Sequence, residues 1–181
     1  MARRCIDHLI QEHKLILRAV YVLEAMAADA SEARLPESSD VEKLLTFLRQ
    51  FADDHHQGKE EAVLFPAVRI TAGIPAGPLQ HMMFEHAQEL TMVEGLESAL
   101  RTQDCTDFAH CGARLAQTLS NHIYKEDNIL FFQIEQRIDD DADSKIVDEM
   151  LAMDERFGAT RRLEMTQIVT YLEWKYLSKA P

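Results

Sequence analysis

Two segments of this chain are near-copies of each other, and each contains a histidine and a glutamate four residues apart. One copy is His56–Glu60 and the other is His122–Glu126, and each is followed by an acidic residue and then by Leu-Phe. On an α-helix, residues at this spacing project from the same face. An imidazole and a carboxylate on one face are ligands with which helical bundles hold iron, manganese or zinc. The duplication therefore predicts two metal ions, or one ion held from two sides.

The apolar residues recur almost throughout with the period of a helix, and almost nothing alternates with the period of a strand. Helices are expected over about residues 5–29, 41–70, 79–100, 105–138, 144–157 and 160–177. Ser39 or Asp40 can cap the second helix, while Gly58 and Pro66 inside it are expected to bend or loosen it. Loops are expected at 31–40, 71–78 and 139–143, with a tight turn at 102–104.

Four long helices with short connections predict an all-α fold, an antiparallel up-down four-helix bundle. The two C-terminal helices would then pack across its outside, with Tyr171, Trp174 and Leu177 as anchors. We expect a single domain over residues 1–181, in which the bundle covers about 5–138 and the C-terminal helical cap about 144–178.

Two further histidine pairs, His8/His13 and His81/His86, lie on the first and third expected helices. Residues five apart on a helix point about 140° away from each other, so one member of each pair faces a shared metal. His13 and His86 are favoured because each follows a glutamate and lies at the depth of the duplicated motifs, with His13 roughly 24 Å from the first interhelical loop at 1.5 Å per residue. His8 and His81 are both expected to pack or to support a ligand. If there is an additional imidazole ligand, His81 is the better candidate.

The carboxylates also require a choice, because Glu61 and Asp127 follow the two motif glutamates directly. A carboxylate four residues from the histidine lies nearer to its face than one five residues away. Asp127 remains an alternative, and both acidic runs could instead be solvated helix faces. Together these arguments predict the metal ligands His13, His56, Glu60, His86, His122 and Glu126.

The net charge of −12, from 31 acidic and 19 basic residues, argues against nucleic acid and anionic membranes as partners. No apolar run is long enough to span a membrane, and the first residues do not resemble a signal peptide. The three cysteines, Cys5, Cys105 and Cys111, lack CxxC spacing and favour a reducing compartment, so a cytoplasmic location is expected. Hydrolase and nucleotide-binding motifs are missing from the sequence.

The combination of His13, the two His-x3-Glu motifs and His86 resembles the hemerythrin-like family, also called the HHE cation-binding domain. Neighbouring residues agree, since Leu64-Phe65-Pro66 follows the first motif and Gly77-Pro78 precedes Glu85-His86. The resemblance covers about residues 5–138 and is closer to the bacterial single-domain members than to the invertebrate oxygen carriers. It implies a four-helix bundle around a non-haem di-iron centre with two ions per chain, in which two carboxylates bridge the irons.

The oxygen-carrying members place two histidines four apart on the third helix, whereas Met82 and Leu90 occupy the positions four either side of His86 here. This difference argues against reversible oxygen carriage. The expected function is therefore binding of, or reaction with, a small oxidant (O₂, peroxide or NO) at a di-iron centre. Iron sensing or storage without turnover is one alternative, and a structural zinc or manganese site is another. The sequence leaves a homodimer and enzymatic turnover open.

The surroundings of the metal pocket can also be anticipated. Met82, Met83, Phe84 and Ile123 are expected to keep the pocket dry and to tune access to it. Tyr124 could donate a hydrogen bond near the metal, or could equally face outward.

Overall fold

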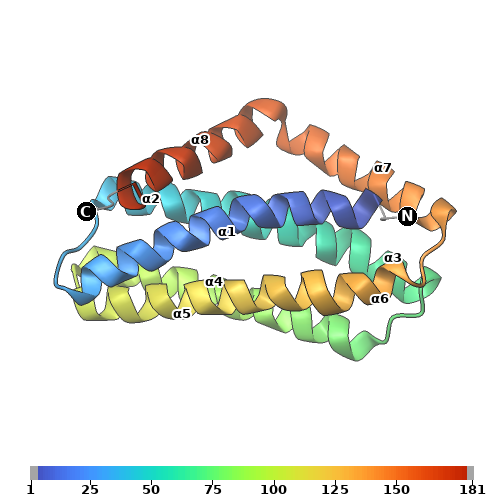
Figure 1. The fold of residues 1–181 in the computed structure, drawn as a ribbon, viewed down its shortest axis with the longest axis horizontal. Helices are drawn as coiled ribbons and strands as arrows, with labels where there is room; N and C mark the ends of the chain where they lie inside the picture. The colour runs from blue at the N-terminus through green and yellow to red at the C-terminus, as the bar shows by residue number, and fades with distance from the viewer. Residues whose placement is uncertain (1–3, 179–181) are drawn as a thin grey trace.

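The computed structural model describes residues 4–178, so residues 1–3 and 179–181 of the predicted domain lie outside the described range. Four helical rods lie lengthwise beside one another in an up-down order (Figure 1). Two further helices follow each other end to end along one side of this bundle, over the first rod, with a bend where they meet (Figure 1). The described residues contain no strand, and the all-α prediction is confirmed.

The first and third rods are single long helices, whereas the second and fourth include π-helical segments, marked η. The first rod is α1 (Arg4–Ser31), and the third is α4 (Ala76–Thr102). The second rod consists of α2 (Ser38–Phe47), η1 (Leu48–Gln57), η2 (Glu60–Leu64) and α3 (Phe65–Thr71). The fourth consists of α5 (Cys105–Lys125), η3 (Glu126–Leu130) and α6 (Phe131–Glu135). The C-terminal helix pair consists of α7 (Asp140–Phe157) and α8 (Ala159–Tyr176).

The π-helical segments η2 and η3 begin at the two glutamates of the repeated motif, Glu60 and Glu126. Pro66 lies in the first turn of α3, directly after η2, where its missing N–H is tolerated. No proline follows η3, so Pro66 does not explain a feature that occurs in both copies. π-helical turns concentrate at functional sites, and here they coincide with the repeated motif.

Several predicted boundaries were wrong. The second rod begins at Ser38 with Glu37 as its N-cap residue, and Glu37 makes no side-chain cap. Asp40 is instead fully buried and accepts hydrogen bonds from Lys43, Lys175 and Tyr176, which ties α8 to α2. The third rod begins at Ala76, inside the expected 71–78 loop, and the fourth ends at Glu135 rather than near residue 138.

Residues 140–143 of the acidic run are helical rather than a loop, and Asp139 is the N-cap. Oδ1 of Asp139 accepts from the backbone N–H of Ala142 at 2.8 Å and caps α7. Its acidic neighbours then occupy the first helical turn, where negative charge is favourable. The predicted turn at 102–104 is confirmed, since Gln103 adopts a left-handed conformation and Asp104 caps α5.

The last helix, α8, packs against the bundle through residues other than those expected. Met165, Val169 and Leu172 of α8 are buried, whereas the predicted anchors Tyr171, Trp174 and Leu177 are exposed. The buried set follows the 3.6-residue period, so α8 is rotated relative to the expected orientation. None of the helices described between residues 4 and 178 is long and apolar enough to cross a membrane.

The apolar interior consists of two clusters, one toward each end of the bundle. One includes Ile16, Leu119 and Ile123, and the other includes Leu9, Leu64 and others from the opposite end. His13 lies on α1 between Leu9 and Ile16, and is itself buried. A polar layer is therefore enclosed between two hydrocarbon regions that keep water away from it.

Candidate metal centre

The structure brings all six predicted ligands into this polar layer. Each is no more than 4 % exposed, and the set comes from all four rods: His13, His56, Glu60, His86, His122 and Glu126. Their ligand atoms form two groups in which all atoms lie within 4.8 Å of one another. We call His13 and His56 the first half-site, and His86 and His122 the second half-site. Both half-sites share Glu60 and Glu126.

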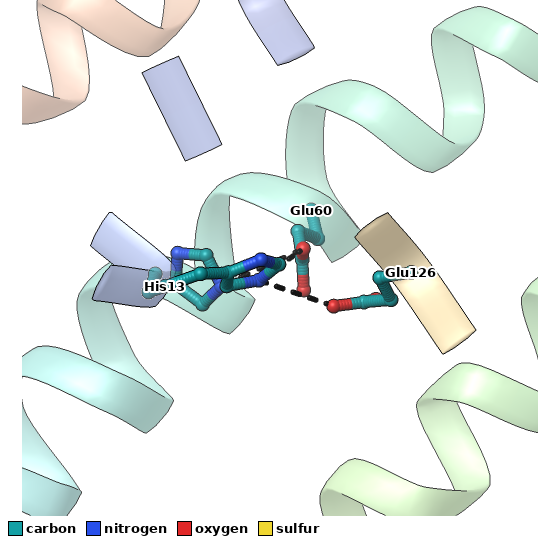
Figure 2. Close-up of side chains that lie close together, drawn as sticks. His13, Glu60 and Glu126 are labelled. Atoms are coloured by element: carbon teal, nitrogen blue, oxygen red, sulfur yellow. Dashed lines mark ion pairs between the residues drawn. The ribbon is translucent and has the colours of Figure 1, made fainter. Parts of the chain in front are cut away.

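In the first half-site, the imidazoles approach the two carboxylates through Nε2. His13 Nε2 lies 3.3 Å from Glu126 Oε2 and 3.9 Å from Glu60 Oε1 (Figure 2). His56 Nε2 lies 3.6 Å from Glu60 Oε1. The glutamates point toward His13 from two different rods (Figure 2).

The second half-site repeats this arrangement on the other side of the carboxylates. His86 Nε2 lies 3.5 Å from Glu60 Oε2, and His122 Nε2 lies 3.3 Å from Glu126 Oε2. The two Nε2 atoms of this half-site are 3.1 Å apart. Glu60 therefore presents one carboxylate oxygen to each half-site.

Each histidine is also held by a carboxylate at its other ring nitrogen, and two of these carboxylates directly precede a ligand histidine. Glu12 precedes His13 but contacts His56, with 3.0 Å between Oε2 and Nδ1. Glu85 precedes His86 but contacts His122, also at 3.0 Å. A proton held on Nδ1 by a carboxylate leaves the Nε2 lone pair free for a metal.

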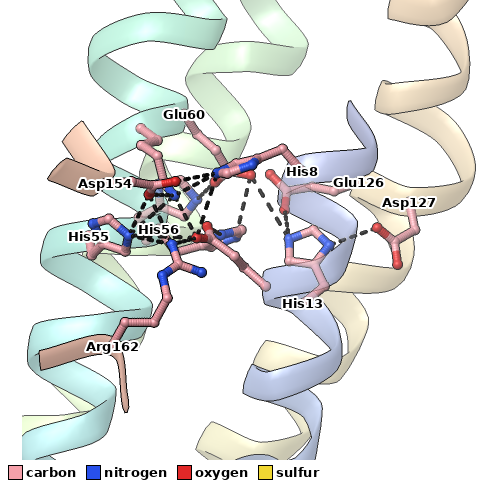
Figure 3. Close-up of polar contacts among 12 residues, drawn as sticks. His8, His13, His55, His56, Glu60, Glu126, Asp127, Asp154 and Arg162 are labelled. Atoms are coloured by element: carbon pink, nitrogen blue, oxygen red, sulfur yellow. Dashed lines mark hydrogen bonds and ion pairs between the residues drawn. The ribbon is translucent and has the colours of Figure 1, made fainter. Parts of the chain in front are cut away.

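The other two such carboxylates directly follow the motif glutamates. Glu61 contacts Nδ1 of His86 at 2.7 Å, and Asp127 contacts Nδ1 of His13 at 2.7 Å (Figure 3). The ambiguity between adjacent acidic residues is thus resolved geometrically, because one acid of each pair faces the centre and the other orients a histidine. Sequence reasoning missed the orienting roles of all four acids, although each lies beside a predicted ligand.

A buried network of charged side chains connects the first half-site to the C-terminal helix pair. Lys59 Nζ donates to Glu12 Oε1 at 2.5 Å and to Asp154 Oδ1 at 2.9 Å. Arg162 donates to the same two oxygens at 2.8 and 2.9 Å (Figure 3). Glu12 holds His56, so residues of α7 and α8 support a candidate ligand.

The hydrogen-bonded neighbours and burial shift the pKa values of the centre in opposite directions. Burial and the adjacent charge of Glu126 raise the pKa of Glu60 well above its usual range. Burial alone would raise the pKa of Glu126, but His122 and His13 outweigh it and hold that pKa low. Burial opposes protonation of His122, yet Glu126 and other acids raise its pKa to about 9. For His56 burial dominates and lowers the pKa to about 4.

Several buried atoms of the centre lack partners. Among the described residues, Nε2 of His13 and both oxygens of Glu60 and Glu126 make no hydrogen bond. Unpaired buried carboxylates are costly, and bound cations would compensate them. Nitrogen and carboxylate oxygen ligands suit iron, manganese and zinc, so the residues present fit a pair of transition-metal ions.

Comparison with protein families agrees with this geometry. Residues 5–134 match the model of the Hemerythrin HHE cation binding domain. The chain belongs to this family. Membership implies cation binding. The match ends before α7, so the C-terminal helix pair lies outside the matched region. Neither the curated proteins nor the solved structures include a match to this chain.

Two other histidines lie outside both groups of ligand atoms of this hemerythrin-like centre. His8 pairs with Asp154 at 3.0 Å, in the network that supports His56, whereas His81 is exposed and pairs with Glu85 at 3.1 Å. Met82 and Ile123 are buried as expected and Tyr124 faces outward, the second of its two alternatives, but Met83 and Phe84 are exposed. Helical rotation explains this, since residues adjacent to a buried position turn about 100° away from it.

Two buried phenylalanines cover the hemerythrin-like centre instead. The ring of Phe131 stacks on His13 with centroids 5.6 Å apart, and Phe65 stacks on His86 at 6.2 Å. Each lies five residues after a motif glutamate, so the repeat itself could have identified them. They exclude water from one end of each half-site.

Proposed function

We propose that this protein holds a non-haem di-iron centre that binds or reacts with a small oxidant. The observation that carries the proposal is the sharing of Glu60 and Glu126 by two histidine pairs. Each half-site supplies two imidazoles and two carboxylates, a donor set that suits Fe(II) and Fe(III). When iron is bound, four protein ligands per ion leave coordination positions for a small molecule.

The residues of the chain prepare the site in three ways. The acids at Nδ1 orient the imidazoles and fix their tautomer. The two apolar clusters and Phe65 and Phe131 exclude bulk water. The network at Lys59 neutralises the buried Glu12. Together these contacts support a preorganised and dry site for redox-active metal.

Elemental analysis of protein purified without added metal is the first test, and two irons per chain are expected. Metal-free protein is then loaded with ferrous iron under anaerobic conditions, and its absorption is followed after addition of O₂, hydrogen peroxide or NO. Loading with one ion per chain, or no spectral change with all three molecules, would overturn the proposal. Iron binding that stabilises the fold without consuming any oxidant would identify a sensor or store. Native zinc or manganese would identify a structural site.

A further inference from the structure

A buried polar pair, Gln57 and Glu89, lies beside the metal centre but belongs to neither group of ligand atoms. Gln57 directly follows His56, and Glu89 lies one helical turn after His86 on α4. Gln57 Nε2 donates to Glu89 Oε2 at 2.7 Å, while Glu89 Oε1 has no hydrogen-bond partner within residues 4–178. A carboxyl oxygen buried without a partner is costly, so this pair requires an explanation beyond packing.

The repeat shows that the bundle does not need polar residues here. Ile123 follows His122 as Gln57 follows His56, and Ile16 follows His13 by three residues as Glu89 follows His86. Both isoleucines are buried. The repeat thus relates Gln57 and Glu89, on the second and third rods, to two isoleucines on the fourth and first rods. The centre is therefore polar on the side of the second and third rods and hydrocarbon on the side of the first and fourth.

Gln57 and Glu89 also line a small cavity between η1, α4 and α5. Its volume is about 20 Å³. Besides Gln57 and Glu89, two charged residues, Arg49 and Asp53, line it, and the rest of the wall is aliphatic, formed by Leu48, Ala52, Leu90, Val93, Leu115 and Leu119. Such a volume accommodates a molecule of one or two heavy atoms, since a single water needs roughly 10–15 Å³ on this scale. Gln57 and Glu89 are the lining residues nearest in sequence to the ligands His56 and His86. Each of these two lining residues thus lies within one helical turn of a candidate ligand.

The charges around Glu89 include two candidate ligands of the metal centre, His122 and Glu126. Burial raises its pKa to about 7, although His122 opposes this shift and Glu126 adds to it. Near neutral pH the carboxyl group can thus either donate or accept a hydrogen bond. Gln57 contributes an amide beside it, so the cavity offers both kinds of hydrogen-bonding partner.

We infer that Gln57 and Glu89 form a binding site for hydrogen peroxide beside the metal centre. Hydrogen peroxide carries two O–H donors, and Oε1 of Glu89 is available to accept one of them. O₂ and NO have no donor, so neither can satisfy an acceptor oxygen at Oε1 of Glu89. The inference rests on the proposed di-iron function and selects among the three small molecules that this function allows.

The test uses the double variant Glu89→Leu/Gln57→Leu, which imitates the apolar side formed by Ile16 and Ile123. It is compared with Glu89→Gln, and with Ile16→Leu as a matched control at the position that the repeat relates to Glu89. Iron per chain and the melting temperature of the metal-free protein are measured first. The rate at which peroxide oxidises the diferrous protein and the rate of NO binding follow. In the peroxide reaction, two ferrous ions give one electron each, and H₂O₂ with two protons becomes two waters.

The double variant should keep two irons per chain and melt no lower than the parent, because the leucines replace an incompletely paired carboxyl group. Its peroxide rate should fall at least tenfold, Glu89→Gln should lie between, and NO binding should change less than twofold. Equal changes in both rates, or a lower melting temperature with loss of iron, would overturn the inference. A parent protein that lacks two irons, or ignores every oxidant, refutes the proposed function before the variants are compared.

Discussion

Adjacent residues of this site have different roles, because a step of one position along a helix turns the side chain to another direction. Glu60 and Glu61 are adjacent, yet Glu60 is fully buried between the half-sites whereas Glu61 is partly exposed and orients His86. The sequence could rank these acids by spacing. It could not show that both are used, because the second role depends on the neighbouring rod.

Glu60 should be destabilising when no metal is bound, since its carboxyl group is buried beside Glu126. A raised pKa contributes stability below the normal pKa of 4.5, and this contribution is lost as the pH rises through the shifted value. Glu60→Gln should therefore stabilise the metal-free protein at neutral pH by about 1–3 kcal/mol, with a smaller gain near pH 4. Urea unfolding at several pH values measures this, and a destabilised variant at pH 7 would contradict it. Because both half-sites share Glu60, the variant should also bind fewer than two metals.

Lys59 and Lys125 precede the two motif glutamates and contact equivalent acids, Glu12 and Glu85. Lys59 is completely buried, whereas the Lys125 side chain is 30 % exposed. Lys59→Met should lower the free energy of unfolding by about 3 kcal/mol, as expected when a buried charge loses its partner. Lys125→Met should cost about 1 kcal/mol or less. Denaturant titration of both variants provides the comparison, and equal losses would refute the asymmetry.

The repeat relates the first two rods to the last two, and the C-terminal helix pair breaks the symmetry between them. α7 and α8 lie beyond the matched family region, yet Asp154 and Arg162 join the network that holds Glu12 against His56 (Figure 3). The second half-site has no counterpart of this cover among the described residues, since its Glu85 pairs with Lys125 and His81 near the surface.

Asp154→Asn should therefore weaken metal binding although Asp154 is not a ligand. Loss of its charge frees Lys59 and Arg162 to compete with His56 for Glu12, and such supporting contacts are worth about tenfold in metal affinity. Competition with a coloured chelator measures the affinity. Asp148→Asn, an exposed change of the same charge on α7, is the control and should leave affinity unchanged. Equal effects of the two variants on affinity would exclude a role of the C-terminal helix pair in metal binding.

For the whole molecule, metal binding and folding should be coupled through protons. Without metal, the neighbouring acids raise the pKa of His122 to about 9, so this imidazole carries a proton at neutral pH, and burial raises the pKa of Glu60. A metal ion must displace the His122 proton, because it binds the neutral imidazole, and it also favours the ionised form of Glu60. Affinity should consequently increase as the pH rises from 6 toward 9.

Calorimetry of zinc binding at pH 7 in two buffers of different ionisation enthalpy counts the released protons, and at least one per chain is expected. Saturating metal at about a thousand times the dissociation constant should stabilise the protein by roughly 4 kcal/mol. The melting temperature should then rise by about 10 °C for a chain of this size. Binding without proton release would contradict the coupling.

The sequence by itself determined the helical class, the four-rod order and the convergence of six side chains, because helical period and the duplicated His-x3-Glu spacing are local properties. The tertiary structure alone decided which acids orient histidines, since Glu12 and Glu85 each act on a ligand from another rod. It also decided the rotation of α8, the cover over one half-site and the burial of Gln57 and Glu89. These features depend on contacts between distant segments, and the hydrophobic period of a single helix carries no information about its partner.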